Sequence, residues 1–183
     1  MRKFGLLLGL VLLLCLPAAA QDHSKADVFL GYSYVRAKPS TSGAPSFNLN
    51  GGSGSIAFNP SSSFGVVADF GGYHLDETIG GTPVSGNLYT YLFGPRLYYR
   101  GPGLTPFVQA LFGGARLTGG ALGTTGSENA FAMTVGGGLD VNASRHVGIR
   151  LAQVEYLMTR FTEGTSRETQ NNLRVSAGIV FRF

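Results

Sequence analysis

The chain ends on Ser176-Ala-Gly-Ile-Val-Phe-Arg-Phe183, and this stretch decides the fold. The apolar positions of its strand share one face: Leu173, Val175, Ala177, Ile179, Phe181 and Phe183. The other face is polar or small except at Val180. Side chains alternate between the two faces of a strand, so this segment is a ribbon with one oily and one polar side. An oily face that ends the chain on an aromatic residue is typical of a strand that meets lipid.

The N-terminus has the pattern of a secretory signal peptide. Basic residues at positions 2 and 3 precede an apolar run from Phe4 to Leu16, and Ala18-Ala19-Ala20 follows shortly after. A short apolar run that ends in small residues is a cleavage signal rather than a membrane span. We therefore expect residues 1–20 to be a signal peptide and residues 21–183 to form one domain.

Cys15, the only cysteine of the chain, suggests one alternative, lipid attachment at a lipoprotein cleavage point. The preceding residue is Leu14, where such a site needs a small residue. Cleavage before Gln21 removes the cysteine, so we expect neither a disulfide nor a cysteine metal site. Cleavage also removes two of the positive charges behind the formal net charge of +4. The remaining charge pattern gives no reason to invoke nucleic acid.

Eight segments show the two-residue periodicity of strands. Their expected cores are Asp27–Val35, Asn48–Phe58, Phe64–His74, Asn87–Tyr99, Pro106–Thr118, Ala130–Val141, Val147–Phe161 and Asn172–Phe183. Glycine interrupts almost every segment and disfavours helices. Beyond the signal, no apolar run approaches the ~20 residues of a membrane helix. Only helices and closed barrels satisfy every backbone polar group in lipid, so a membrane protein with this pattern has to be a barrel.

The expected connections alternate between long and short. The long ones are Arg36–Phe47, Leu75–Gly86, Gly119–Asn129 and Thr162–Asn171; the short ones are Asn59–Ser63, Arg100–Thr105 and Asn142–His146. Bacterial outer-membrane barrels show this asymmetry, with short periplasmic turns and long external loops. The fold class is therefore all-β, an eight-stranded antiparallel up-and-down transmembrane barrel. Its last strand should pair with its first and leave no free edge.

Side-chain volume decides which face meets lipid. A soluble up-and-down barrel also alternates, but with its oily face inward and a charged exterior. An eight-stranded interior is only wide enough to be filled by side chains, so the small polar face fits inside and the bulky apolar face outside. Beyond the signal, the only lysines are Lys25 and Lys38, too few for a solvated exterior.

The polar faces carry charges of both signs, which a narrow lumen should bring into pairs. These expected lumen charges are Asp69, Arg96, Asp140, Glu155, Arg174 and Arg182. They can be structural packing, or a polar thread for ions or protons. Arg150 is ambiguous because it shares its strand face with apolar residues; either a bulge or an interface position would explain it.

Aromatic residues near strand ends are candidates for the two interfacial girdles of a membrane barrel. These candidates are Tyr34, Tyr89, Tyr98, Tyr99, Phe161 and Phe183.

With these features the chain resembles the small eight-stranded outer-membrane barrels, the family of the OmpA-like barrel domain, over essentially its whole mature length. The most specific match is the family's assembly signal, at Ser176, Gly178, Phe181 and Phe183. The resemblance implies a Gram-negative outer membrane, insertion by the barrel assembly machinery after periplasmic chaperones, and contact with outer-membrane lipid. OmpA itself carries a peptidoglycan-binding domain after its barrel. This sequence stops at Phe183, so that anchoring role is not carried over.

Some small barrels of this kind are lipid-modifying enzymes that use a histidine near a serine and a carboxylate. His74, Asp76 and Ser85 are a faint echo of that arrangement, and His146 lacks the serine of the deacylase pattern. No metal-ligand spacing is present, and we expect no cofactor. Gly51-Gly52-Ser53-Gly54 is no phosphate loop because no helix follows it. We expect a non-catalytic structural or surface-interaction protein with no ligand assigned; a narrow channel or a lipid-modifying enzyme are the alternatives.

Overall fold

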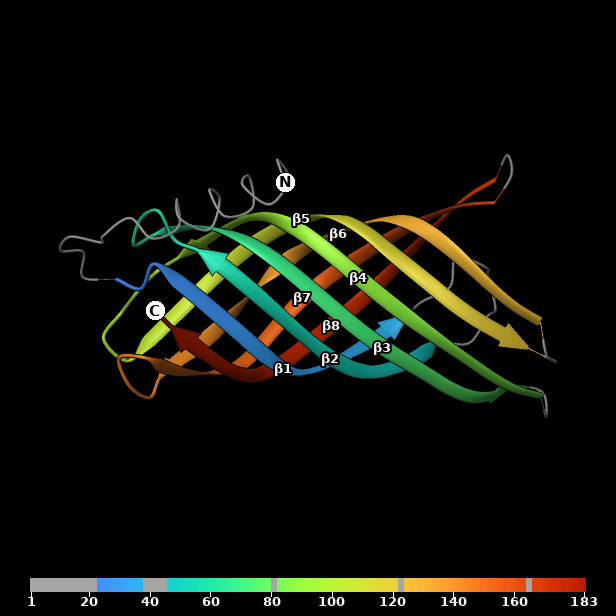
Figure 1. Cartoon of the computed structure of the whole chain (residues 1–183), viewed down its shortest axis with the longest axis horizontal. Coiled ribbons are helices and arrows are strands. Elements are labelled where there is room, and N and C mark those ends of the chain that lie inside the picture. Colours follow the sequence, from blue (N-terminus) through green and yellow to red (C-terminus); the bar gives the residue numbers. More distant parts are fainter. Residues whose placement is uncertain (1–22, 38–45, 80–81, 122–123, 164–165) are drawn as a thin grey trace, which may run out of the picture.

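The computed structural model describes residues 23–37, 46–79, 82–121, 124–163 and 166–183; the expected signal peptide lies outside this part of the chain. Eight antiparallel strands form a closed barrel in sequence order (Figure 1). They are β1 (Ala26–Ala37), β2 (Phe47–Phe58), β3 (Phe64–Ile79), β4 (Thr82–Tyr98), β5 (Leu104–Ala121), β6 (Thr124–Asn142), β7 (Val147–Glu163) and β8 (Ser166–Arg182). The expected fold class is confirmed. Within the described ranges, no helix has the length and hydropathy needed to cross a membrane.

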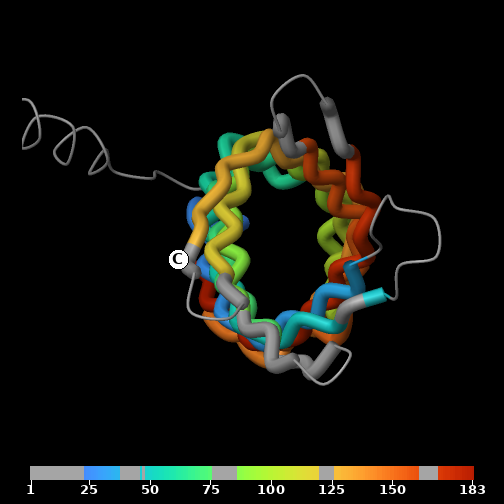
Figure 2. Tube along the Cα trace, turned by 90° about the vertical axis from the view of Figure 1, so that its right-hand side faces the viewer, coloured from blue at the N-terminus to red at the C-terminus, as the bar shows by residue number. Residues whose placement is uncertain are grey.

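The first and last strands close the barrel, as the sequence predicts. β1 pairs with β8 from Asp27 opposite Arg182 to Arg36 opposite Leu173. Figure 2 looks along the barrel and shows the continuous ring that results. Because the ladder has no gap, every strand has hydrogen-bonded neighbours on both sides and no edge is left to lipid.

Three of the expected long connections are for the most part paired strand. The β3–β4 ladder continues to Ile79 opposite Thr82, β5–β6 to Ala121 opposite Thr124, and β7–β8 to Glu163 opposite Ser166. These stretches are rich in glycine, serine, threonine and charged residues, and this composition indicates exposure to water. Exposure to water does not interrupt the hydrogen bonds between adjacent antiparallel strands. The paired strands of these hairpins therefore extend the barrel at the end away from the two termini of the described chain (Figure 1).

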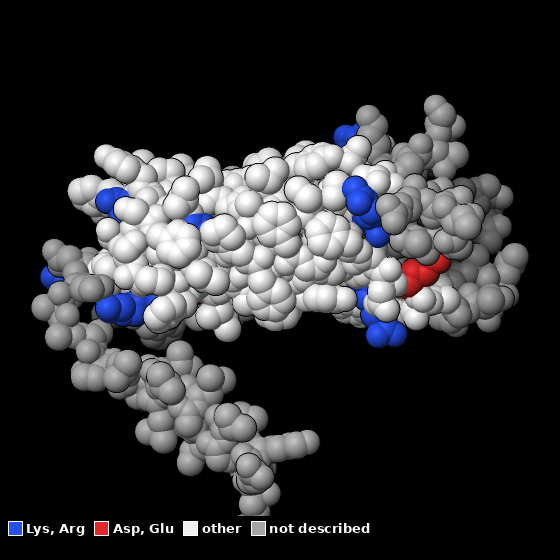
Figure 3. Space-filling model, turned by 90° about the horizontal axis from the view of Figure 1, so that it is seen from above, with Lys and Arg blue, Asp and Glu red and all other residues white. Residues whose placement is uncertain are grey.

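The outer face carries the bulky apolar side chains. Leu30, Phe70, Phe93, Val108 and Ile149 are each about half exposed, with many similar residues on all eight strands. Figure 3 shows charged side chains near the two ends of the molecule and an almost uncharged surface between them. This band is the expected lipid-facing surface, and it has the arrangement of a transmembrane barrel.

The lumen is more aromatic than the volume argument predicts. Tyr73, Tyr98 and Phe107 are buried inside it. A Cβ atom added at Gly71 would collide with the Tyr73 side chain, and one at Gly138 with the Phe107 ring. Inward-facing glycines therefore make room for large neighbours, so the average side-chain size of the inner face remains small.

The prediction that Tyr98 belongs to a girdle is wrong, because Tyr98 is 6% exposed and points inward. Its place at the end of β4 suggested an interface, but its strand face is that of Arg96, two residues earlier. Tyr34, Tyr89, Tyr99 and Phe183 lie on the outer face. The side chain of Phe161 lies outside the described residues.

A bulge resolves the ambiguous seventh strand. The pairing of β7 with β8 shifts register between Arg150 and Gln153, and the pairing with β6 shifts between Leu139 and Asp140. Leu151 and Ala152 both point outward, so the faces change over at this point. One extra residue in a strand has this effect because side chains alternate with a period of two. Arg150 is thereby turned into the lumen.

The closing seam yields a prediction about Gly178. It lies opposite Gly31 in the seam, and a Cβ added there would collide with the Leu30 carbonyl oxygen and the Gly31 Cα. We expect Gly178→Ala to lower the free energy of unfolding by about 1–3 kcal/mol, the usual cost of overpacking. Urea unfolding in lipid vesicles, followed by heat-modifiable migration on gels, measures the change.

Gly72→Ala is the matched control, since a Cβ at Gly72 would meet nothing closer than 3.6 Å. Equal stability of the two variants would show that the seam tolerates a side chain at position 178.

Candidate functional site in the barrel lumen

The six lumen charges proposed from the sequence lie inside the barrel and are shielded from solvent. None of them is more than 7% exposed: Asp69, Arg96, Asp140, Glu155, Arg174 and Arg182. Charges buried to this degree require partners, because isolated ions lose their hydration without compensation.

Arg174 of β8 is the centre of the network. Its Nη1 donates to Asp69 Oδ1 at 2.7 Å and its Nε to Glu155 Oε2 at 2.6 Å. Nη1 also lies 3.3 Å from the Tyr73 hydroxyl. Asp69 and Tyr73 come from β3, and Glu155 from β7. One guanidinium thus ties two carboxylates that stand on non-adjacent strands across the lumen.

Two glutamines extend the network from Glu155. Gln109 Nε2 donates to Glu155 Oε1 at 2.6 Å, and Gln153 Nε2 donates to Glu155 Oε2 at 2.7 Å. Their amide oxygens then accept from arginines: Arg96 Nε donates to Gln109 Oε1 at 2.7 Å and Arg150 Nη1 to Gln153 Oε1 at 2.6 Å. Each glutamine therefore relays between the central carboxylate and a further guanidinium.

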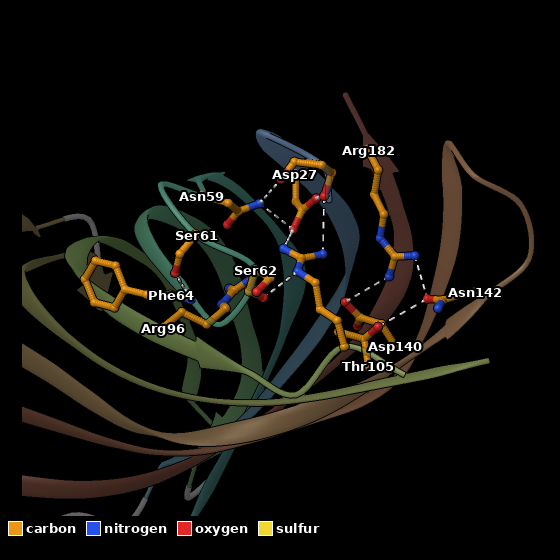
Figure 4. A network of polar contacts seen from close by, with 12 residues as sticks. Asp27, Asn59, Ser61, Ser62, Phe64, Arg96, Thr105, Asp140, Asn142 and Arg182 are labelled. Atoms are coloured by element: carbon orange, nitrogen blue, oxygen red, sulfur yellow. Dashed lines mark hydrogen bonds and ion pairs between the residues drawn. The ribbon is translucent and has the colours of Figure 1, made fainter. Parts of the chain in front are cut away.

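Arg150 leads toward the short-turn end of the barrel. It forms a two-point pair with Asp140, with N–O distances of 2.7 and 3.1 Å. Arg182 lies 3.9 Å from the same carboxylate and donates to the Asn142 amide oxygen. Figure 4 shows Arg182 between Asp140 and Asn142. The polar chain is thus continuous from Asp69 to Asn142.

Aromatic rings complete the surroundings of two arginines. The Arg96 guanidinium carbon lies 4.5 Å from the Phe107 ring centroid, and that of Arg150 lies 4.4 Å from the same centroid. Arg150 is also 4.3 Å from the Phe29 centroid. A guanidinium over an aromatic face is attracted by the ring quadrupole, most strongly when water is excluded.

The buried charges of this network do not balance. Its cations are Arg96, Arg150, Arg174 and Arg182, and its carboxylates are Asp69, Asp140 and Glu155; the fourth buried carboxylate, Asp27, pairs with Arg100 outside the network. Among the described residues Arg96 forms no ion pair, and one of its Nη atoms has no hydrogen-bond partner there. This network therefore has one more guanidinium than carboxylate, and Arg96 is stabilised by an amide oxygen and an aromatic face instead.

A separate polar group closes the short-turn end. Asp27 pairs with Arg100 at 3.1 Å and accepts from Asn59 Nδ2 at 3.0 Å. Figure 4 shows Asp27 beside Asn59. The Arg100 guanidinium carbon lies 4.3 Å from the Tyr98 ring centroid.

Toward the hairpin end, apolar side chains fill the lumen. Val35, Leu49, Leu88, Leu92 and Leu157 belong to one buried cluster that also includes Tyr73. The lumen therefore combines a paired polar network with an apolar plug, and both exclude water.

The structure describes His74 and His146, two of the histidines considered for catalysis. His74 is exposed on the outer face, and its Nδ1 lies 2.9 Å from Asn87 Oδ1. The side chains of Asp76 and Ser85 lie outside the described residues. His146 is in the turn between β6 and β7. No cluster of three or more metal-ligating side chains occurs among the described residues.

The four residues of the proposed assembly signal have different surroundings. Ser176 is buried and shares a hydrogen bond with Ser33 across the closing seam, and Gly178 faces Gly31. Phe181 and Phe183 point outward, with exposures of 38% and 70%. Half of the motif thus belongs to the seam and half to the outer surface.

Five network members were missing from the sequence prediction: Arg150, Gln109, Gln153, Tyr73 and Asn142. Arg150 was left out because its apolar strand face allowed either a bulge or an interface position, and the sequence did not decide between them. Gln153 lies on the same strand face as the predicted charge Glu155, and Gln109 lies on the same face as the buried Phe107 and Leu111. An amide side chain on the inward face, close to an isolated charge, was the signal that could have identified the glutamines as network members.

Solved barrel structures share this architecture. Ail, the attachment invasion locus protein of Yersinia pestis, superposes with a TM-score of 0.59 at 16% identity, covering 87% of this chain and 99% of Ail. Neisserial surface protein A gives 0.67 at 13%, with 89% and 100% covered. The N-terminal barrel of OprF from Pseudomonas aeruginosa gives 0.53 at 18%, with 88% and 100% covered. At identities this low, the superpositions show a shared fold alone.

A family model described as the outer membrane protein beta-barrel domain matches residues 6–183. No curated protein matches the chain.

The central position of Arg174 yields a prediction. We expect Arg174→Met to lower the free energy of unfolding by about 3–5 kcal/mol, because the carboxylates of Asp69 and Glu155 lose their shared cation. Adding Asp69→Asn and Glu155→Gln to this variant should recover part of the loss, since the unpaired charges are then removed. Urea titration of the refolded protein in vesicles measures both.

Arg145→Met, at an exposed turn position, is the control and should change stability by no more than about 0.5 kcal/mol. If Arg174→Met were equally mild, the network would not carry the stability we assign to it.

Proposed function

The chain belongs to the outer membrane protein beta-barrel domain family, and we propose that it is an integral outer-membrane protein with a structural or surface-interaction role and no catalytic one. The observation that carries this proposal is the filled lumen. Arg96, Arg150, Arg174, Leu92 and Leu157 are among its largest fully buried side chains, each exposed by less than 2%. A barrel filled in this way is not a wide aqueous pore.

The cost of opening supports the same conclusion. Water or solute could pass only if the Arg174 pairs with Asp69 and Glu155 separated. Breaking a buried pair leaves charges without compensation and costs several kcal/mol. The lumen thus serves to hold the barrel rigid, and the external hairpins are the parts that reach beyond the membrane.

Absence of catalysis is part of the proposal. His74, the histidine nearest to a candidate arrangement, is hydrogen-bonded to the neutral Asn87. A neutral amide does not stabilise an imidazolium as the carboxylate of a catalytic triad does.

The route to the membrane is the second part of the proposal. Residues 1–20 direct export and are removed, and periplasmic chaperones deliver the chain to the barrel assembly machinery. That machinery reads Ser176, Gly178, Phe181 and Phe183. The exposed rings of Phe181 and Phe183 support this role, because they add little to the packing of the barrel and are available to a partner.

A narrow-conductance channel is the second candidate, and one observation favours it. Hydrogen bonds connect the polar groups from Asp69 through Glu155 and Arg150 to Asp140, and an ion pair of 3.9 Å between Asp140 and Arg182 continues the chain to Asn142. A chain of this kind could guide an ion or a proton if the network rearranged.

Planar-bilayer recording separates the two candidates. We expect refolded wild-type protein to give no discrete conductance steps, because the Arg174 pairs and the apolar plug close the lumen. Arg174→Met is the comparison, since its lumen has lost the central cation. Regular single-channel steps in the wild type would favour the channel.

Phe183 tests the assembly signal. We expect Phe183→Ala to reduce the amount of folded protein in the outer membrane of cells, while refolding of the purified chain in vesicles changes little. Leu104→Ala is the matched control, an exposed apolar residue at the same end of the barrel. Folded and unfolded bands on heat-modifiable gels measure both. Equal yields of the two variants in cells would argue against a signal role.

A further inference from the structure

A groove of about 740 Å³ crosses the outer face of β1–β4 within the lipid-facing band. Gly52, Gly54 and Gly72 form its floor, and Leu30, Phe70 and Tyr89 are the large side chains beside them. Strand pairing puts Tyr32, Gly52, Gly72 and Tyr89 in one cross-strand row. In this row the two middle positions, on β2 and β3, are glycines, and a tyrosine lies on either side of them. The lining is almost entirely apolar.

Close backbone packing does not explain Gly52 and Gly72, whereas a Cβ at Gly54 would lie 3.1 Å from the Leu30 side chain and 3.3 Å from the Phe29 carbonyl oxygen. A Cβ added at Gly52 or at Gly72 would meet nothing closer than 3.6 Å. This contrasts with Gly178, where the main chain of β1 leaves no space. Glycine weakens a strand and provides no side chain to pack, so its use at two paired outward positions where larger residues fit needs another reason. We infer that the glycines are there because they keep this part of the outer surface concave.

Beyond the lining of the groove, on the side nearer the hairpins, the outward side chains are polar. One residue pair further along the strands, Asn50, His74 and Asn87 form the next outward row. Tyr32 donates to the Asn50 amide oxygen at 2.6 Å, and His74 bonds to Asn87. Arg116 of β5 is exposed and lies directly opposite Tyr89, in the row that contains the glycines.

We propose that the groove holds one acyl chain of a membrane lipid whose phosphate headgroup is bound at Arg116, beside the Asn50–His74–Asn87 row. The inference rests on the outer-membrane placement under Proposed function. A lipid in this position accounts for an apolar groove with a glycine floor that lies next to hydrogen-bonding groups and a cation. The volume is within the range of about 300–1,000 Å³ found for ligand sites. An anionic headgroup matches the guanidinium better than a zwitterionic one.

The chemistry admits two sources of phosphate, a glycerophospholipid or a phosphorylated glycolipid. A second copy of the chain is a different occupant. A two-fold pair would set the groove against the same concave surface, and the glycine rows supply no ridge to fill it.

Native mass spectrometry of the refolded protein in detergent micelles tests the proposal. The probes are dimyristoyl phosphatidylglycerol, dimyristoyl phosphatidylcholine and lipid A, added separately. We expect the wild type to retain one lipid and to prefer phosphatidylglycerol over phosphatidylcholine about two- to fivefold, the range for one exposed ion pair. Whichever of phosphatidylglycerol and lipid A is retained better identifies the source of the phosphate.

Two variants separate the acyl and headgroup parts. The double variant Gly52→Leu, Gly72→Leu should lose retention of all three lipids, because its side chains fill the groove. Arg116→Gln should retain phosphatidylcholine as the wild type does and lose the preference for phosphatidylglycerol. Ala177→Leu is the control, an exposed outward alanine of β8 outside the groove, and should behave as the wild type.

Heat-modifiable migration first establishes that each variant is folded. If the leucine pair does not fold, Gly52→Ala, Gly72→Ala replaces it and should give partial loss. Unchanged lipid retention in a filled groove, or an unchanged preference in Arg116→Gln, would overturn the proposal. So would a wild-type dimer that the leucines abolish, since the occupant would then be a second copy. Wild-type protein that stays soluble and folded without detergent would instead contradict the proposed function.

Discussion

The narrow lumen of an eight-stranded barrel is the constraint on which the other features depend. Such a lumen has room for side chains and little else, so each inward residue must fit its neighbours in volume and in charge. Arg174 satisfies two carboxylates at once, and Gly71 and Gly138 make room for Tyr73 and Phe107. The same constraint turns the bulky apolar residues outward, where lipid accommodates any shape.

Much of the fold follows from local pattern. The two-residue period of segments such as Phe64–His74 and the oily face of the last strand predict eight strands and their sidedness, because a residue's face depends only on its position along the strand. The extent of pairing was harder to predict. The stretches after His74 and Thr118 have the composition of loops, yet their ladders continue to Ile79 and Ala121. Pairing there depends on the partner strand, which composition does not describe.

The candidate site shows the same division. Isolated charges such as Asp69 and Glu155 could be assigned to the lumen from parity, but their partners could not, since contacts across the barrel depend on the registers of all eight strands. The bulge at Leu151 shows the limit most clearly. A single extra residue reverses the face of Arg150, and the structure shows this through the contacts of Arg150 with Asp140 of β6 and Gln153 of β7. The alternation of faces therefore predicts a side chain's direction only within a stretch of strand that contains no bulge.

The closing seam has a consequence for the rate of folding. Ser33 and Ser176, hydrogen-bonded across it, are 143 residues apart in sequence, whereas the other strand pairs join neighbours in the chain. Hairpins lose little chain entropy when they form, but the β1–β8 contact requires the whole chain to be closed into a loop. We therefore expect the ordered sheet to form before its two ends meet, with that meeting as the slow kinetic step. The glycine pair at the seam lowers the steric barrier where the chain has the greatest distance to search.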